Sequence, residues 1–312
     1  MAREEDIPPA PTAMAALLAD IAPGSTLEEI APLPGSYSNY THLVRAATAT
    51  GEPLQLVVRR YRSWGDSAPD YTRPAARARR EYAAFALLRR HGIPAPPPLR
   101  LDDTGALLGS PGIVTGYVQG TQVEDPGDPV HWAQELATML ACLHAAPCDA
   151  EARRLFLDMD SYLVWFLRGG GVPDFMAADP DGAAVWHSVR DHLPTRRPVS
   201  HGFVHADYWP GNILWVGDSI SAVLDLEEAG IGDPSSDVAY CRMCMLLSGE
   251  DTAAATFLAC YEAATGGPCP NLAFWDLAAA ARPMIDPADW QLDRPATHAR
   301  FRAFIADALR RI

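Results

Sequence analysis

The amino-acid sequence predicts an α+β chain with two unequal lobes, a small strand-rich lobe followed by a larger and mainly helical one. Three observations lead to this prediction. The chain has 312 residues, which is long for a single hydrophobic core. Strand-like runs are concentrated before residue 120, and helical periodicity dominates after it. The apolar share of 48% and the charged share of 21% are typical of soluble globular proteins.

The expected elements of the first lobe follow from turn residues and hydrophobic periodicity. One helix is expected over 77–91, where apolar residues recur at helical spacing and a glycine follows the end. Residues 1–26 are rich in Pro and Ala and contain one short helical patch, so they are expected to form an N-terminal extension. We then place the first lobe at 27–119 and the second at 120–312. The runs that read as strands are 27–33, 40–47, 54–59, 99–102 and 110–118.

The stretch from 205 to 237 carries the residue types that hold a divalent metal and orient a hydroxyl group. Asp207 leads a segment interrupted by Pro and Gly, and Asn212 follows it five residues later. Two apolar runs with a turn between them predict a hairpin that ends at Asp225. Such a hairpin would let Asn212 and Asp225 flank one cleft, with Asp207 beside them. Hard oxygen ligands without sulfur suit Mg²⁺ bound to nucleotide phosphates.

This stretch resembles the catalytic and metal-binding loops of protein kinases, in the variant found in the aminoglycoside phosphotransferase and choline kinase-like superfamily. The matching residues are His205-Ala206-Asp207, then Asn212, then Asp225-Leu226-Glu227. Ala206 stands where the family usually has Gly, and Leu226 stands where an aromatic residue is usual. Neither departure removes a ligand. The resemblance covers roughly residues 27 to 245 and implies a two-lobed protein-kinase-like fold, whose small lobe has an antiparallel five-stranded sheet plus one helix.

The resemblance also implies roles for individual residues. Asp207 would orient the acceptor hydroxyl and accept its proton, and Asn212 and Asp225 would hold Mg²⁺. Arg59 would contact the nucleotide phosphates, with Glu81 as its ion-pair partner. His205 and Asp237 would support the catalytic loop. The full set of expected nucleotide-binding residues is Ser36 and Tyr37 in a covering loop, Arg59, Glu81, and the hinge residues Gly116, Tyr117 and Val118.

The activity that the resemblance implies is transfer of the γ-phosphoryl group of ATP, with GTP as the alternative nucleotide, to a hydroxyl of a small molecule. An aminoglycoside-type antibiotic, or a similar amino sugar or amino alcohol, is the first expectation. A metabolic acceptor such as choline, homoserine or a sugar is the alternative, and a catalytically inactive kinase-like binding module is a further one. Monomer and homodimer both stay open. The candidate residues for binding amino groups of the acceptor are Asp276, Asp286, Asp289 and Asp293.

The net charge and the composition limit the kinds of binding partner that we expect for this protein. The net charge of −14 argues against nonspecific binding to nucleic acid or anionic membranes, and it favours a cationic acceptor. The absence of a membrane-span or signal-peptide pattern leads us to expect a cytoplasmic location. As an alternative metal site, the odd-numbered spacing of His201, His205 and Asp207 could form an iron triad on one strand face. Cys241 and Cys244 are expected to be core thiols.

Overall fold

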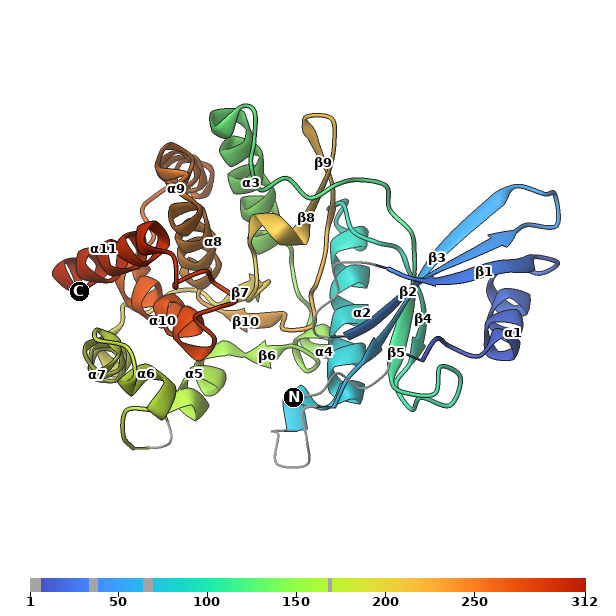
Figure 1. Cartoon of the computed structure of the whole chain (residues 1–312), viewed down its shortest axis with the longest axis horizontal. Coiled ribbons are helices and arrows are strands. Elements are labelled where there is room, and N and C mark those ends of the chain that lie inside the picture. Colours follow the sequence, from blue (N-terminus) through green and yellow to red (C-terminus); the bar gives the residue numbers. More distant parts are fainter. Residues whose placement is uncertain (1–6, 34–38, 64–69, 168–169) are drawn as a thin grey trace. The chain divides into compact units, whose positions relative to one another are not determined.

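The computed structural model describes residues 7–33, 39–63, 70–167 and 170–312. The chain separates into two compact units, one of residues 1–119 with 221–228 and one of residues 120–220 with 229–312. Figure 1 shows the order of helices and strands along the chain. The predicted fold class is confirmed, since a five-stranded antiparallel sheet precedes a mainly helical C-terminal region.

The sheet of the first unit has the strand order β1-β2-β3-β5-β4, and every pair of neighbours is antiparallel. Strand β5 lies between β3 and β4, so its side chains are buried almost along its whole length. This arrangement places β3 in the middle of the sheet. The strands are β1 (Thr26–Pro32), β2 (Asn39–Ala47), β3 (Pro53–Tyr61), β4 (Pro98–Asp102) and β5 (Gly112–Gly116).

Helix α1 (Pro11–Ile21) belongs to the apolar core of the first unit. The sequence predicts only an extension with a short helical patch here. In the structure, Met14, Leu17 and Leu18 are almost fully buried and cluster with sheet residues that include Leu56 and Val58. Burying side chains of this size removes apolar surface from water and stabilises the unit. The helix therefore covers one face of the sheet.

Helix α2 (Pro74–Arg90) covers the other face. Side chains alternate along a strand, so Arg59 and Tyr61 of β3 point away from the face that packs on α1. Both of them contact Glu81 of α2. The helix begins at Pro74, before the predicted start at Arg77, because proline at a first helical position has no N–H that needs a partner. The short 3₁₀ helix η1 (Asp70–Thr72) precedes it.

The second unit is mainly helical, and its longer helices pack in pairs, α3 with α9 and α8 with α10. A small sheet of order β6-β10-β7 lies within it. Among the described residues, no helix has both the length and the apolar character needed to cross a membrane. The elements are α3 (Pro129–His144), α4 (Ala150–Arg153), β6 (Leu157–Asp158), α5 (Met159–Leu167), α6 (Asp174–Ala177), α7 (Gly182–His192), η2 (Leu193–Thr195), β7 (Gly202–Val204), β10 (Gly230–Gly232), α8 (Ser235–Ser248), α9 (Asp251–Thr265), α10 (Leu272–Ile285) and α11 (Pro295–Arg311).

The predicted hairpin is present as strands β8 (Ile213–Val216) and β9 (Ser219–Val223), which form a two-stranded sheet. The 3₁₀ helix η3 (Pro210–Asn212) precedes it and begins with proline. A side chain at Gly211 would place its Cβ 2.3 Å from the Trp209 ring, so a larger residue there would require the ring to move. Cys241 and Cys244 are buried in α8, which agrees with the prediction of core thiols.

Candidate functional site

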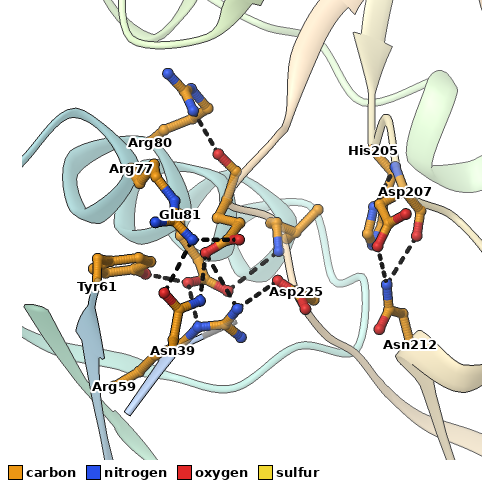
Figure 2. A network of polar contacts seen from close by, with 12 residues as sticks. Asn39, Arg59, Tyr61, Arg77, Arg80, Glu81, His205, Asp207, Asn212 and Asp225 are labelled. Carbon is orange, nitrogen blue, oxygen red and sulfur yellow. Dashed lines mark hydrogen bonds and ion pairs between the residues drawn. The ribbon is translucent and has the colours of Figure 1, made fainter. Parts of the chain in front are cut away.

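In the first unit, Arg59 is surrounded by the carboxylates of three acidic residues (Figure 2). Its Nη2 donates to Asp225 Oδ1 at 2.6 Å and to Glu227 Oε2 at 3.2 Å. Its Nε lies 3.4 Å from Glu81 Oε2, so the expected Arg59–Glu81 ion pair is present. The Arg59 side chain is only 16% exposed, which strengthens these attractions relative to those between surface charges.

Glu81 is a fully buried carboxyl at the centre of this cluster. One of its oxygens accepts a hydrogen bond from the Tyr61 hydroxyl, and the other accepts from the backbone N–H of Leu226 at 3.2 Å. Burial raises the pKa of Glu81 to about 7; Arg59 opposes this rise, and the nearby Asp225 and Glu227 add to it. The carboxyl therefore changes its protonation state near neutral pH.

Glu227 is a second centre of the cluster, and its role here was not predicted from the sequence. Arg77 Nη2 donates to Glu227 Oε1 at 2.7 Å and to Asn39 Oδ1 at 2.9 Å, and Asn39 Nδ2 donates to Glu227 Oε2 at 2.7 Å. Arg80 Nη1 reaches the Glu227 backbone oxygen at 2.5 Å. Burial acts to raise the pKa of Glu227, but Arg59 and Arg77 outweigh it and hold the pKa below its ordinary value. The Asp-Leu-Glu motif draws attention to Glu227 in the sequence, whereas no local pattern identifies the residues that form hydrogen bonds with it.

Asp225 has an unusual backbone conformation, with φ at +58°. Aspartate tolerates this left-handed region better than most residues because its short polar side chain can bond locally. Its side chain is 29% exposed and, in this structure, is ion-paired with Arg59. The carboxylate is a hard oxygen donor of the type that Mg²⁺ prefers.

The expected hinge residues lie at the end of β5 and just after it. The backbone N–H of Gly116 donates to Pro97 O at 2.9 Å, and that of Tyr117 donates to a carbonyl of the preceding β3 segment at 3.1 Å. Since these two N–H groups are used inside the unit, a backbone hydrogen bond from Gly116 or Tyr117 to a base would have to use a carbonyl oxygen. Val118, which is half-buried, is the third predicted hinge residue. The covering-loop residues Ser36 and Tyr37 lie outside the described residues.

In the second unit, side chains from different elements hold Asp207. Asn212 Nδ2 donates to Asp207 Oδ2 and to its backbone oxygen, both at 2.9 Å, as Figure 2 shows. Arg282 of α10 donates from Nη1 to Asp207 Oδ1 at 2.7 Å and from Nη2 to Ala206 O at 2.6 Å. Carboxylate oxygens only accept, so the Asn212 amide must turn its NH₂ toward Asp207 and its Oδ1 away. This leaves the Oδ1 oriented as a potential metal ligand.

Asp237 fixes the backbone on either side of Ala206. Its two carboxylate oxygens accept the N–H groups of His205 at 2.7 Å and Ala206 at 2.8 Å, which is the arrangement expected for a loop support. His144 of α3 also contacts Asp237 at 3.0 Å and contacts the Tyr261 hydroxyl at 2.7 Å. Burial acts to raise the pKa of Asp237, but the hydrogen bond and charge of His144 outweigh it and lower the pKa.

Ala206 stands where the resemblance noted from the sequence leads us to expect glycine, and its backbone conformation accounts for that expectation. Its φ is +66°, a left-handed conformation that an alanine side chain disfavours. The unusual backbone angle occurs where two consecutive N–H groups are both directed at Asp237. His205 is fully buried beside it, and its Nδ1 accepts the N–H of Asp207 at 3.2 Å. The sequence departure is therefore accommodated without loss of the loop geometry.

The structure removes one of the four acidic candidates for acceptor binding. Asp276 is completely buried and ion-paired with Arg242 and Arg311, so it serves the core of the second unit. Burial raises the pKa of Asp276, and the two arginines act against this rise. The other three candidates are exposed: Asp286, Asp289 and Asp293.

The alternative iron triad has no geometric support. His201 is partly exposed and its nearest acidic partner is Asp160, at 4.0 Å. His205 is buried and bonded to the backbone of Asp207. Across the described ranges of the chain, no group of three or more His, Cys, Asp or Glu residues could hold a metal ion.

Comparison with known proteins gives a consistent set of relatives. The profile of the phosphotransferase enzyme family (APH) matches residues 29–278. A homoserine kinase from Nitrobacter winogradskyi is 31% identical over 160 residues, which are 49% of this chain and 48% of that protein. The chain thus spans about half the length of the curated relatives it matches.

Two solved structures illustrate the fold. A putative aminoglycoside phosphotransferase from Ralstonia eutropha JMP134 has a TM-score of 0.63 and 20% identity, with 96% of each chain covered. The complex of APH(2")-IIIa with GDP and kanamycin has a TM-score of 0.61 and 16% identity, with 95% of this chain and 96% of that chain covered. At these identities the two structures support the fold alone.

Proposed function

The chain belongs to the phosphotransferase enzyme family, and on that basis we propose that it transfers the γ-phosphoryl group of ATP, or of GTP as the alternative donor, to a hydroxyl of a small molecule. The observation that carries the proposal is the way Asp207 is held. Its carboxylate is 25% exposed, and its two oxygens are bonded to Asn212 and Arg282. A loose phosphoryl-transfer transition state is accelerated mainly by positioning, and such a carboxylate is positioned in advance.

We assign the remaining roles from the chemistry of each residue. Asp207 orients the acceptor hydroxyl and accepts its proton. Arg59 is our candidate phosphate contact. Burial acts to lower the pKa of its guanidinium, but the charges of Asp225, Glu81 and Glu227 outweigh burial and raise the pKa above its ordinary value, so Arg59 keeps its charge at every physiological pH. Asn212 and Asp225 offer hard oxygen atoms as magnesium ligands, and Mg²⁺ when bound would neutralise phosphate charge.

Two acceptor classes are consistent with this activity. Amino sugars and amino alcohols are the expectation from the sequence. A small hydroxy amino acid is the second candidate, and the curated homoserine kinases that match half of the chain favour it. Nothing specific to this chain supports a role in antibiotic resistance, so that role stays a prediction.

The test of the proposal is the variant Asp207→Asn, which keeps the shape of the side chain and removes its charge. Nucleotide consumption is measured with magnesium and a panel of homoserine, choline, simple sugars, an aminoglycoside and a macrolide. We expect a fall in kcat of about 10²–10⁴-fold with nucleotide affinity unchanged. Asp218→Asn, in the exposed turn between β8 and β9, is the matched control. Unchanged turnover in Asp207→Asn refutes the assignment.

A further inference from the structure

Arg282 is a positively charged side chain placed directly on the proposed catalytic carboxylate. It comes from the last turn of α10 and bridges the Asp207 carboxylate and the Ala206 backbone oxygen. Its guanidinium also lies 4.4 Å from the centre of the Tyr240 ring, which adds a cation–π contact. The side chain stays 29% exposed despite these contacts. The guanidinium is therefore ordered before any acceptor arrives.

The charge balance at this place does not suit a polycationic acceptor. The negative charge of Asp207 is already compensated by Arg282 at 2.7 Å. The acidic residue of α10, Asp276, is completely buried and is engaged with two arginines. Arg282 and Asp207 form a neutral pair, so an amino group of the acceptor finds no uncompensated carboxylate here, and it would be repelled where it meets the exposed part of the guanidinium. A carboxylate that approaches the guanidinium would be attracted.

We propose that Arg282 determines acceptor specificity by binding an anionic group, a carboxylate in the first instance, of the molecule whose hydroxyl Asp207 orients. This inference rests on the proposed phosphotransferase function. A guanidinium carries five N–H donors and a delocalised charge, so it can attract a carboxylate while it is bonded to Asp207. Because Arg282 and Asp207 are in contact, the acceptor that fits best has its hydroxyl and its carboxylate only a few bonds apart.

The reaction balances without a further reagent. The acceptor oxygen forms a bond to the γ-phosphorus while the bond from that phosphorus to the bridging oxygen breaks. The nucleoside diphosphate leaves with the electron pair of the broken bond, and the hydroxyl proton passes to the Asp207 carboxylate. Arg282 takes no part in bond making. Because it also holds Asp207, its removal should lower kcat for every acceptor, and its contact with the acceptor should appear as an additional rise in KM for acceptors that carry a carboxylate.

The experiment compares two acceptors that differ only in the carboxylate, L-homoserine and 3-amino-1-propanol, in the wild type and in Arg282→Met and Arg282→Lys. We expect the wild type to prefer homoserine by at least about 100-fold in kcat/KM. Arg282→Met should lower kcat for both acceptors, because Asp207 loses a partner, and should raise KM by about 100-fold for homoserine alone. Arg282→Lys should recover part of the loss. Arg302→Met, which removes a half-exposed arginine paired with Asp181, is the matched control and should match the wild type.

The outcomes separate the inference from the function on which it rests. If the wild type uses aminopropanol or an aminoglycoside as well as homoserine, or if Arg282→Met leaves KM for homoserine unchanged, the specificity role is overturned while the kinase function stands. If no acceptor is turned over, the proposed function fails. Titration of homoserine and aminopropanol into nucleotide-free protein then decides the inference, which requires that only homoserine binds and that Arg282→Lys weakens it. The same titration serves if Arg282→Met does not fold.

Discussion

Replacing Glu81 by glutamine should change how the stability of this protein depends on pH. Burial, opposed by Arg59 and reinforced by Asp225 and Glu227, raises the pKa of the Glu81 carboxyl to about 7 from an ordinary value of 4.5. The folded protein therefore binds more protons at this group than the unfolded chain does between these two values. Stability contributed by the protonated carboxyl is fully present below about pH 4.5 and is lost as the pH rises through 7.

The size of the effect follows from the two pKa values. They differ by 7 − 4.5 = 2.5. At about 1.36 kcal/mol per pKa unit, the wild type loses at most about 3 kcal/mol of unfolding free energy across this window on account of Glu81. Glutamine is neutral at every pH and has no such loss. Relative to the wild type, Glu81→Gln should therefore gain up to about 3 kcal/mol between about pH 4.5 and pH 8.

Urea denaturation at several values between about pH 4.5 and pH 8 measures the difference. Glu28→Gln, at an exposed carboxylate on β1, is the control and should follow the wild type. Glu227→Gln should differ from the wild type in the opposite sense and at lower pH: arginines hold the pKa of Glu227 below its ordinary value of 4.5, so its stabilising contribution is present above about pH 4.5 and is lost as the pH falls below that value, a range that the denaturation series should also cover. Parallel pH profiles for the wild type and Glu81→Gln would show that the electrostatic reasoning is wrong.

Three further predictions concern the second unit, and urea or thermal denaturation checks each. Ala206→Gly should be about 1–2 kcal/mol less destabilising than Ala239→Gly in α8, because glycine removes the strain at φ +66°; equal losses would contradict this. Asp276→Ala should cost about 3 kcal/mol, since it leaves two arginines without their buried counter-charge, whereas Asp286→Ala should cost almost nothing. Gly211→Ala should cost about 1–3 kcal/mol through its clash with an indole ring, and unchanged stability would show that the ring moves freely.

The elements that local sequence rules govern were predicted well. All five strands of the first unit and helix α2 have turn residues and periodicity that identify them without tertiary information. Helix α1 was visible as a helical patch, but its partner surface was not, because a short apolar stripe does not specify which face of which sheet it covers. The early start of α2 at Pro74 is a boundary effect of proline at a helix N-terminus.

The candidate site was predictable only in part, for a related reason. Asp207, Asn212 and Asp225 stand out because their residue types and spacing are local, and their functional roles stay predictions. Arg282 lies 75 residues from Asp207 in sequence, and nothing near it marks it as a partner. The sequence motif marks Glu227, but it does not identify the side chains that bind Glu227. These come from several elements and are brought together only by packing.

Hydrogen bonds from two separate parts of the second unit hold the proposed catalytic loop in place. Tyr261 of α9, His144 of α3 and Asp237 of α8 form a chain of polar contacts that ends on two backbone amides of the loop. On the other side, Arg282 bonds the Asp207 carboxylate and the Ala206 backbone oxygen. If Asp207 and Arg282 have the roles proposed above, substitutions near the end of α10 would alter acceptor choice while the amide anchor keeps the Asp207 carboxylate in place. Laboratory evolution toward a new acceptor would then begin at the end of α10.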